Sequence, residues 1–342
     1  MNQQENSNNK YLVIGSNCFT GSHIVNQLLN ASNNKVYGIS RSSEPPAFML
    51  PYKSNKNTKN FVFSQIDLVR DIEKAITYID KIQPTHIINV AALSEVELSH
   101  EVPLGYFNIN LTSVVQLCDI LRTRSYLEHY IHISSAEIYG STPEPVREDS
   151  IITPTTPYAV SKTAADMYLL TLMQKYSFPV SMIRSTNVYG PYQQLFKIIP
   201  RCFIYIKTGQ TINLHGGGNA VRHFIHIRDV VDAILLVCNK RFFGPLNFSI
   251  SAEDQINPKY EIKNVVNYIC KLMECKMEDV TQYSEKREHQ DHCYSLDSTK
   301  ANQILGWNPN IEFEEGITET YEWIKENWEE IKSAEHSYKH KE

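Results

Sequence analysis

Short apolar runs alternate with longer amphipathic stretches through the first half of the 342-residue chain. The apolar runs lie at 11–14, 36–39, 61–66, 86–90, 130–133 and 180–183. Because they are almost continuously apolar, they predict parallel strands that are covered on both faces of a sheet. The stretches between them, at 21–29, 71–82, 104–122 and 159–176, are predicted to be helices. This regular alternation predicts an α/β fold with a doubly wound parallel sheet.

The alternation changes after about residue 186, where loops lengthen and isolated strands separate the helices. We therefore predict a dinucleotide-binding domain of the Rossmann type over 1–185, to which the segment 219–247 returns. The remaining segments, 186–218 and 248–342, are predicted to form a smaller C-terminal α/β lobe that binds the substrate.

Bulk properties exclude several classes of function. A net charge of −5 argues against a nucleic-acid-binding protein. The sequence has no uninterrupted apolar run of the about 18 residues that a membrane span needs, and its polar first residues lack the apolar segment of a signal peptide. Seven scattered cysteines without zinc-type spacing predict reduced thiols, no metal and a cytoplasmic protein. The nearby His215, His223 and His226 are predicted to be structural.

The first strand runs into the segment Gly15-Ser16-Asn17-Cys18-Phe19-Thr20-Gly21 and then into a helix. A glycine turn at the start of a helix presents amide N–H groups and the positive helix end to a diphosphate. The segment therefore predicts a dinucleotide site, and an ordinary strand-to-helix turn is the alternative. The candidate cofactor-binding residues in it are Gly15, Asn17, Cys18, Phe19, Thr20 and Gly21.

The second strand ends in Ser40 and Arg41, where an enzyme that prefers NAD usually has Asp or Glu. A guanidinium group suits a 2′-phosphate because its planar fork of N–H donors matches phosphate oxygens. We therefore predict NADP as the favoured cofactor, with NAD as the alternative. In that alternative Arg41 stacks on adenine or faces solvent.

A catalytic pattern follows the fifth strand. Ser135 closes that strand, and Tyr158 and Lys162 follow four residues apart on one face of a helix. A phenol has an unperturbed pKa of about 10, so it is a poor base at neutral pH. A nearby ammonium group and a positive nicotinamide ring favour phenolate, which lets Tyr158 take a proton from a hydroxyl that Ser135 also contacts.

With these motifs the chain resembles the extended short-chain dehydrogenases/reductases, and most of all the nucleotide-sugar 4,6-dehydratases of the dTDP-glucose 4,6-dehydratase group. The resemblance extends from Lys10 to about Trp328. It implies that Asp67 and Leu68 contact the adenine and that Ala91 and Ala92 lie along the cofactor. It also implies that Lys162 holds the nicotinamide ribose.

The resemblance further implies that the substrate is a nucleotide-diphosphate sugar. Asn187 would contact its diphosphate or sugar, and Ser94 belongs to the same site. Arg222 and Arg287 would bind the diphosphate through paired charge-assisted hydrogen bonds, with surface ion pairs as the alternative. Lys197 and Ile199 would contact the base, mostly through the main chain.

The implied reaction has three steps. Tyr158 assists the passage of hydride from sugar carbon 4 to NAD(P), which gives a 4-keto sugar. Glu137 then removes the proton on carbon 5 while water leaves carbon 6. The hydride returns to carbon 6, so that the product is a 4-keto-6-deoxy sugar and the tightly bound cofactor is regenerated in each turnover.

One departure from the family pattern is Ala136, where dTDP-glucose dehydratases have an aspartate that is thought to protonate the leaving hydroxyl. Alanine has no titratable group, so three alternatives stay open. They are a dehydratase that stops at an unsaturated sugar, a nucleotide-sugar 4-epimerase, and a non-enzymatic protein that senses NADP or a nucleotide sugar. The resemblance also implies a homodimer through the helices near 104–122 and 159–172.

Overall fold

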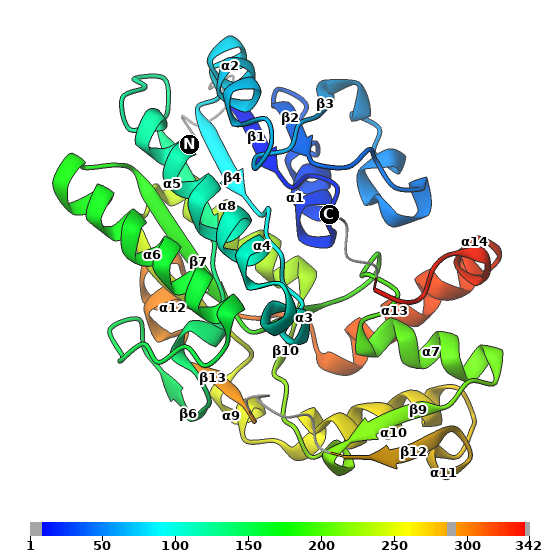
Figure 1. Ribbon diagram of the computed structural model, residues 1–342. Helices are drawn as coiled ribbons and strands as arrows, with labels where there is room; N and C mark the ends of the chain where they lie inside the picture. The colour runs from blue at the N-terminus through cyan, green and yellow to red at the C-terminus, as the bar shows by residue number, and fades with distance from the viewer. Residues whose placement is uncertain (1–8, 286–291, 339–342) are drawn as a thin grey trace.

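The computed structural model describes residues 9–285 and 292–338. At its centre is a seven-stranded parallel sheet in the order β11-β7-β5-β4-β1-β2-β3 (Figure 1). The strands are β1 (Lys10–Ile14), β2 (Lys35–Ser40), β3 (Phe61–Gln65), β4 (His86–Asn89), β5 (His129–Ile133), β7 (Val180–Ser185) and β11 (Gly244–Phe248). Six of them coincide with the predicted apolar runs, which confirms the doubly wound parallel sheet. β11 comes from the segment after residue 219 and pairs with β7 at the sheet edge.

Alternate residues of the central strands enter two separate cores. In β1, Tyr11 and Val13 pack toward α1 (Phe19–Leu28) and α8 (Ile227–Lys240). Leu12 and Ile14 enter the opposite core. The helices of that second core are α2 (Ile72–Ile82), α5 (Ser113–Leu121) and α6 (Pro157–Tyr176). Helices therefore cover both faces of the sheet, as the continuous apolar runs predict.

The helix predicted over 104–122 is interrupted. It consists of α4 (Pro103–Phe107), a π-helical turn (Asn108–Thr112) and α5. In the π turn the buried Asn110 side chain accepts a 3.0 Å hydrogen bond from the amide of Leu93 and donates a 3.0 Å hydrogen bond to the hydroxyl of Ser161. The turn thus links the loop after β4 to the helix that carries Tyr158 and Lys162.

Outside the large sheet the described chain forms three two-stranded parallel sheets. They are β8 (Asn187–Tyr189) with β10 (Phe224–His226), β9 (Ile212–His215) with β12 (Thr281–Ser284), and β6 (Thr142–Val146) with β13 (Tyr294–Leu296). The other helices are α3 (Val96–Glu101), α7 (Ile198–Thr208), α9 (Ala252–Gln255), α10 (Ile262–Leu272), α11 (Met277–Val280), α12 (Thr299–Leu305), α13 (Phe313–Glu326) and α14 (Trp328–Ser333). Figure 1 shows β9, β12, α10 and α11 gathered away from the large sheet.

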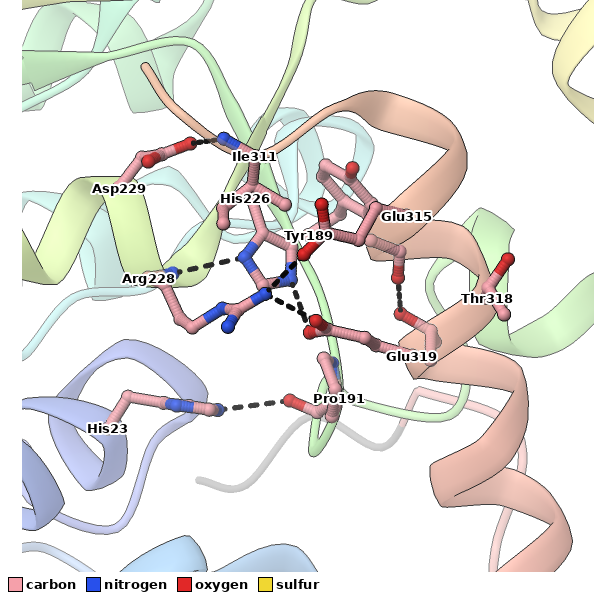
Figure 2. Close-up of polar contacts among 12 residues, drawn as sticks. His23, Tyr189, Pro191, His226, Arg228, Asp229, Ile311, Glu315, Thr318 and Glu319 are labelled. Carbon is pink, nitrogen blue, oxygen red and sulfur yellow. Dashed lines mark hydrogen bonds and ion pairs between the residues drawn. The ribbon is translucent and has the colours of Figure 1, made fainter. Parts of the chain in front are cut away.

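A polar cluster joins α13 to the start of α8 (Figure 2). Arg228 pairs with Glu315 at 3.1 Å and also with Glu319. The Nε2 atom of His226 lies 3.6 Å from Glu319. This contact is not an ion pair at neutral pH, because burial lowers the pKa of His226 to about 3. The Arg228 pairs therefore supply the charged part of the junction.

Several properties bear on membrane and metal binding. Within 9–285 and 292–338, no helix combines the length and apolar character that a membrane crossing requires. The same ranges contain no group of three His, Cys, Asp or Glu side chains arranged for a metal ion. All seven cysteines are free thiols.

Candidate active site

A cavity of about 430 Å³ opens where β1, β4, β5 and β7 end, and it extends toward β8 and β9. In doubly wound sheets, ligands bind at this carboxyl edge of the strands. The predicted site residues that line the cavity are Cys18, Phe19, Thr20, Ala92, Ser94, Ser135, Glu137, Tyr158, Lys162, Asn187, Lys197 and Arg222. The structure thus brings residues assigned to catalysis, cofactor and substrate to one cavity.

The glycine loop is tightly packed. Gly15 has a φ of +86°, and a Cβ there would lie 2.9 Å from the amide nitrogen of Ala91. A Cβ on Gly21 would lie 2.2 Å from the carbonyl oxygen of Gly15. Only glycine therefore fits either position. Cys18 turns its Sγ back to accept a 3.3 Å hydrogen bond from the amide of Gly21, which caps α1.

An unsatisfied polar atom supports a ligand beside this loop. The hydroxyl of Ser134 is buried at the cavity surface, and among the described residues it has no hydrogen-bond partner. A buried hydroxyl is normally satisfied, so this position fits a ligand that supplies the missing partner. The close approach of the glycine backbone fits a dinucleotide in the same place.

Several predicted cofactor residues lie outside the cavity. They are Gly15, Asn17, Gly21, Ser40, Arg41, Asp67, Leu68 and Ala91. The amide of Asn17 donates a 3.1 Å hydrogen bond to the hydroxyl of Ser40, and Arg41 is exposed just beyond β2. The Oδ1 of Asp67 accepts a 2.8 Å hydrogen bond from the amide of Val69, and the side chain of Leu68 lies in the core. Only the main chain of Leu68 is therefore available to a ligand.

Ser135, Glu137 and Tyr158 meet at one side of the cavity. Ser135 hydrogen-bonds to the phenol of Tyr158. Burial, and then the nearby charge of Glu137, raise the pKa of Tyr158, while the hydrogen bond from Ser135 lowers it. The chain's own side chains therefore keep the phenol protonated at neutral pH. The predicted lowering, which combines Lys162 with a positive nicotinamide ring, is not reached by the protein's own groups alone. The physical reason is that Tyr158 is only 7% exposed.

Lys162 is directed toward the end of β5. Its Nζ donates a 2.6 Å hydrogen bond to the carbonyl of Ile133 and lies 3.2 Å from the Nε2 of His132. Burial lowers the pKa of Lys162 to about 8, and the charge of Asp166 opposes that shift. The lysine is thus still mostly an ammonium group at neutral pH.

Besides Lys162, the cationic side chains of Lys197, Arg201 and Arg222 line the cavity. Arg222 donates hydrogen bonds of 2.7 Å to the carbonyl of Val221 and 2.9 Å to that of His292. Lys197 pairs with Glu95. Arg201, which the sequence reasoning missed, also lines the cavity and lies one helical turn beyond Lys197. That four-residue spacing is the signal that would have found it.

Two predicted substrate-binding residues remain, Ile199 and Arg287. The side chain of Ile199 is buried in the core, and its neighbour Ile198 lines the cavity instead. A contact from Ile199 to the base would therefore have to come from its main chain. Arg287 lies outside the described residues.

Gln193 is a second cavity residue that the sequence reasoning missed. It is 6% exposed, and its Nε2 donates a 2.8 Å hydrogen bond to the carbonyl of Val188. A carbonyl only accepts, so the amide nitrogen must face it and Oε1 remains. Within the described chain Oε1 is buried without a partner. No residue pattern marks a glutamine in a loop, because its role comes from burial and from the carbonyl that orients it.

Helix α1 also contacts the loop that follows β8 directly. His23 on α1 lies with its Nε2 3.0 Å from the carbonyl oxygen of Pro191 (Figure 2). Burial lowers the pKa of His23 to about 4, so the neutral ring donates this hydrogen bond at Nε2. The loop that follows Asn187 is therefore anchored to the helix that begins at the glycine loop.

Comparisons with known proteins agree with this geometry. Residues 12–320 match the family model described as GDP-mannose 4,6 dehydratase. The dTDP-D-glucose 4,6-dehydratase of Bos taurus is 30% identical over 329 residues, which span 95% of this chain and 91% of the cattle enzyme. The crystal structure of a Bacillus anthracis dTDP-glucose 4,6-dehydratase in complex with NAD is 26% identical with a TM-score of 0.82, covering 94% of this chain and 98% of that one.

A UDP-glucose 4-epimerase from Thermotoga maritima, solved with UDP-glucose, has a similar backbone. Its TM-score is 0.82 at 24% identity, and the match covers 93% of this chain and 99% of the epimerase. At that level of identity the likeness shows the shared fold alone.

Proposed function

This chain belongs to the GDP-mannose 4,6 dehydratase family, and on that premise we propose that it converts a nucleotide-diphosphate sugar to its 4-keto-6-deoxy form. The observation that carries the proposal is the meeting of Glu137 with Ser135 and Tyr158 beside the glycine loop. The phenol and the hydroxyl supply the proton transfer for oxidation, and the carboxylate supplies the base for elimination.

In the oxidation step, Tyr158 takes the proton of the carbon-4 hydroxyl while Ser135 hydrogen-bonds to the same oxygen. Nicotinamide dinucleotide, when bound along the glycine loop, supplies the hydride acceptor for carbon 4 and the hydride donor for carbon 6. Lys162 remains charged at neutral pH and favours loss of the phenol proton. This help is needed because burial, and then the charge of Glu137, raise the pKa of Tyr158.

In the elimination step, Glu137 takes the proton from carbon 5, which the new ketone has made acidic. The carbon–oxygen bond at carbon 6 breaks, and the leaving hydroxyl takes up a proton to form water. Ala136 is 3% exposed, belongs to a buried apolar cluster with Ile138 and Tyr294, and has no titratable group, so it contributes no acid. We infer that Glu137 or a water molecule delivers that proton. As carbon 6 is reduced, carbon 5 takes a proton from Glu137 if the carboxyl still holds one and otherwise from water, and the balance is the loss of one water.

The test is incubation of the purified protein with a panel of dTDP-, UDP-, GDP- and CDP-sugars, followed by mass spectrometry. We expect a product lighter by one water from at least one of them. The Tyr158→Phe variant should form none of it. The absence of any such product across the panel would sink the proposal.

A nucleotide-sugar 4-epimerase is the second candidate, and Ala136 is the observation that favours it. An epimerase needs oxidation and reduction at carbon 4 but no acid for a leaving group. It would give products of unchanged mass and altered stereochemistry, which proton NMR of the sugar ring distinguishes.

We propose NADP as the preferred dinucleotide, with NAD as the alternative. The support is Arg41, which is exposed just beyond β2 where an acidic residue would favour NAD. We also propose that residues 1–185 and 219–247 hold the dinucleotide, and that 186–218 and 248–342 hold the nucleotide sugar. The seven free thiols support a reducing compartment such as the cytoplasm.

We further propose a homodimer. Exposed apolar side chains stand on neighbouring helices α4 and α6, namely Leu104, Val160 and Met167. A second copy that packs its own α4–α6 face on this surface would bury them. Sedimentation at micromolar concentration should give twice the chain mass, whereas a monomer mass would contradict the proposal.

A further inference from the structure

The ammonium group of Lys162 faces a histidine that none of the steps above uses. The Nε2 of His132 lies 3.2 Å from Nζ, and the ring is 0% exposed. Both His132 and Ile133, the other partner of Nζ, belong to the end of β5. The last residues of this strand therefore fix the lysine on which the proposed oxidation depends.

The charge states decide which way the hydrogen bond runs. Burial, and then the charge of Lys162, lower the pKa of His132 well below its ordinary value, so the ring is neutral. A neutral imidazole carries one proton, on either Nδ1 or Nε2. An ammonium group has no lone pair and only donates, so Nε2 must accept from Lys162. The ring proton then lies on Nδ1.

The Nδ1–H group of His132 is buried and has no hydrogen-bond partner among the described residues. A buried N–H without a partner destabilises a fold, so the ring is held in this tautomer at a cost. The contact that the tautomer makes possible is the one with Lys162.

We propose that His132 is a positioning residue, which accepts a hydrogen bond from Lys162 and so holds the place and the charge of its ammonium group. This inference rests on the proposed role of Lys162 in cofactor binding and oxidation. Among the described residues, Asp166 on α6 acts on the charge of Lys162, and Tyr158 on α6 and Glu137 after β5 line the same cavity. Arg184 on β7 pairs with Asp166, with its Nε at 3.0 Å. His132 is the side chain that the structure places within hydrogen-bond distance of Nζ.

The test compares His132→Phe with the full-length wild type. The affinity for NADP and for NAD is measured by calorimetry across the neutral and alkaline range, and the pH profile of kcat is recorded with any accepted sugar. In the wild type, binding should weaken as the pH rises through about 8, where Lys162 loses its charge. We call the pH at which binding weakens the breakpoint. Removal of the acceptor destabilises the ammonium form of Lys162, so in His132→Phe the breakpoint should fall by about one pH unit.

Two variants make the readout specific. His132→Gln should restore the breakpoint, because its longer amide reaches the position of Nε2, whereas His132→Asn should not. His129→Phe is the matched control, since His129 is also 0% exposed on β5 but its Nε2 faces the hydroxyl of Ser181 at 2.7 Å. It should change stability and leave the breakpoint unmoved.

An unmoved breakpoint in His132→Phe would overturn the proposal. If that variant does not fold, equal breakpoints in the Gln and Asn variants overturn it instead. The binding measurement needs no sugar. A shifted breakpoint in a protein that dehydrates no sugar would therefore retain the role of His132 and reject the proposed reaction.

Discussion

The main-chain amide of Glu137 donates a 3.1 Å hydrogen bond to the hydroxyl of Ser135. Ser135 thereby caps the single 3₁₀ turn, Ala136–Tyr139, that carries the proposed base. Because this contact uses the backbone of Glu137, its side chain can be changed while the turn that presents it is kept.

Glu137→Gln should therefore abolish elimination without unfolding the loop. Loss of a positioned base typically lowers a rate by roughly 10²–10⁴-fold, and we expect a fall of that size in water loss measured by mass spectrometry. Glu144→Gln, a change of the same type on exposed β6, is the control. Unchanged dehydration in Glu137→Gln would show that another group removes the proton.

Arg41→Gln should weaken NADP binding by roughly tenfold or more while NAD binding changes little, because a charge-assisted fork to the 2′-phosphate is lost. Isothermal calorimetry with each dinucleotide measures this directly. Arg70→Gln, also at an exposed arginine, controls for a general loss of positive charge. Equal weakening of both dinucleotides would contradict a 2′-phosphate contact.

Gln193→Met should weaken binding of whichever ligand donates to the Oε1 of Gln193. The loss of one buried hydrogen bond, about 1–2 kcal/mol, corresponds to roughly 5- to 30-fold in affinity. Separate titrations with the dinucleotide and with the nucleotide sugar identify the donor. Gln210→Met, at an exposed glutamine, should change neither affinity. Wild-type affinities for both ligands in Gln193→Met would show that Oε1 meets no ligand.

Lys162→Met should stabilise the fold at neutral pH although it abolishes activity. The pKa of Lys162 falls from 10.5 to about 8 on burial, so the folded state disfavours the ammonium form. This shift corresponds to roughly 3 kcal/mol of destabilisation that the variant removes. Loss of the hydrogen bonds to Ile133 and His132 offsets part of that gain, so we expect a net stabilisation of about 1–2 kcal/mol.

The free-energy cost of burying the charged Lys162 depends on pH. The cost is complete below the folded pKa of about 8 and disappears as the pH rises through 10.5. The variant's advantage in urea unfolding should therefore shrink between neutral and strongly alkaline pH. Lys175→Met, at an exposed position of the same helix, should show no such trend.

The strands were predictable from sequence because burial on both faces imposes a continuous apolar run. The run predicted at 11–14 differs from β1 only by Lys10. The π turn at Asn108–Thr112 was not predictable, since the apolar pattern passes through it and only the contacts of Asn110 reveal it. β6 also gave no signal, because its sequence contains two prolines.

The residues of the candidate site also fall into two groups, those that the sequence could predict and those that it could not. Tyr158 and Lys162 are visible because helix geometry fixes their spacing in the chain. His132 and Gln193 are not visible, because each acquires its role only when distant segments meet. His132 acts on a helix that begins 25 residues later, and Gln193 is oriented by the carbonyl of Val188. Such roles depend on packing that one-dimensional patterns do not record.

Between β7 and β11 the chain builds β8, α7 and β9 beside the cavity, and then returns through β10 and α8 to the edge of the large sheet. A single genetic crossover in this stretch would therefore split the sheet from its own last strand. Such a crossover would also take cavity residues on its two sides, such as Tyr158 and Arg222, from different parents. A new sugar preference in a chain of this kind therefore arises more readily by point substitution around the cavity than by a crossover between β7 and β11.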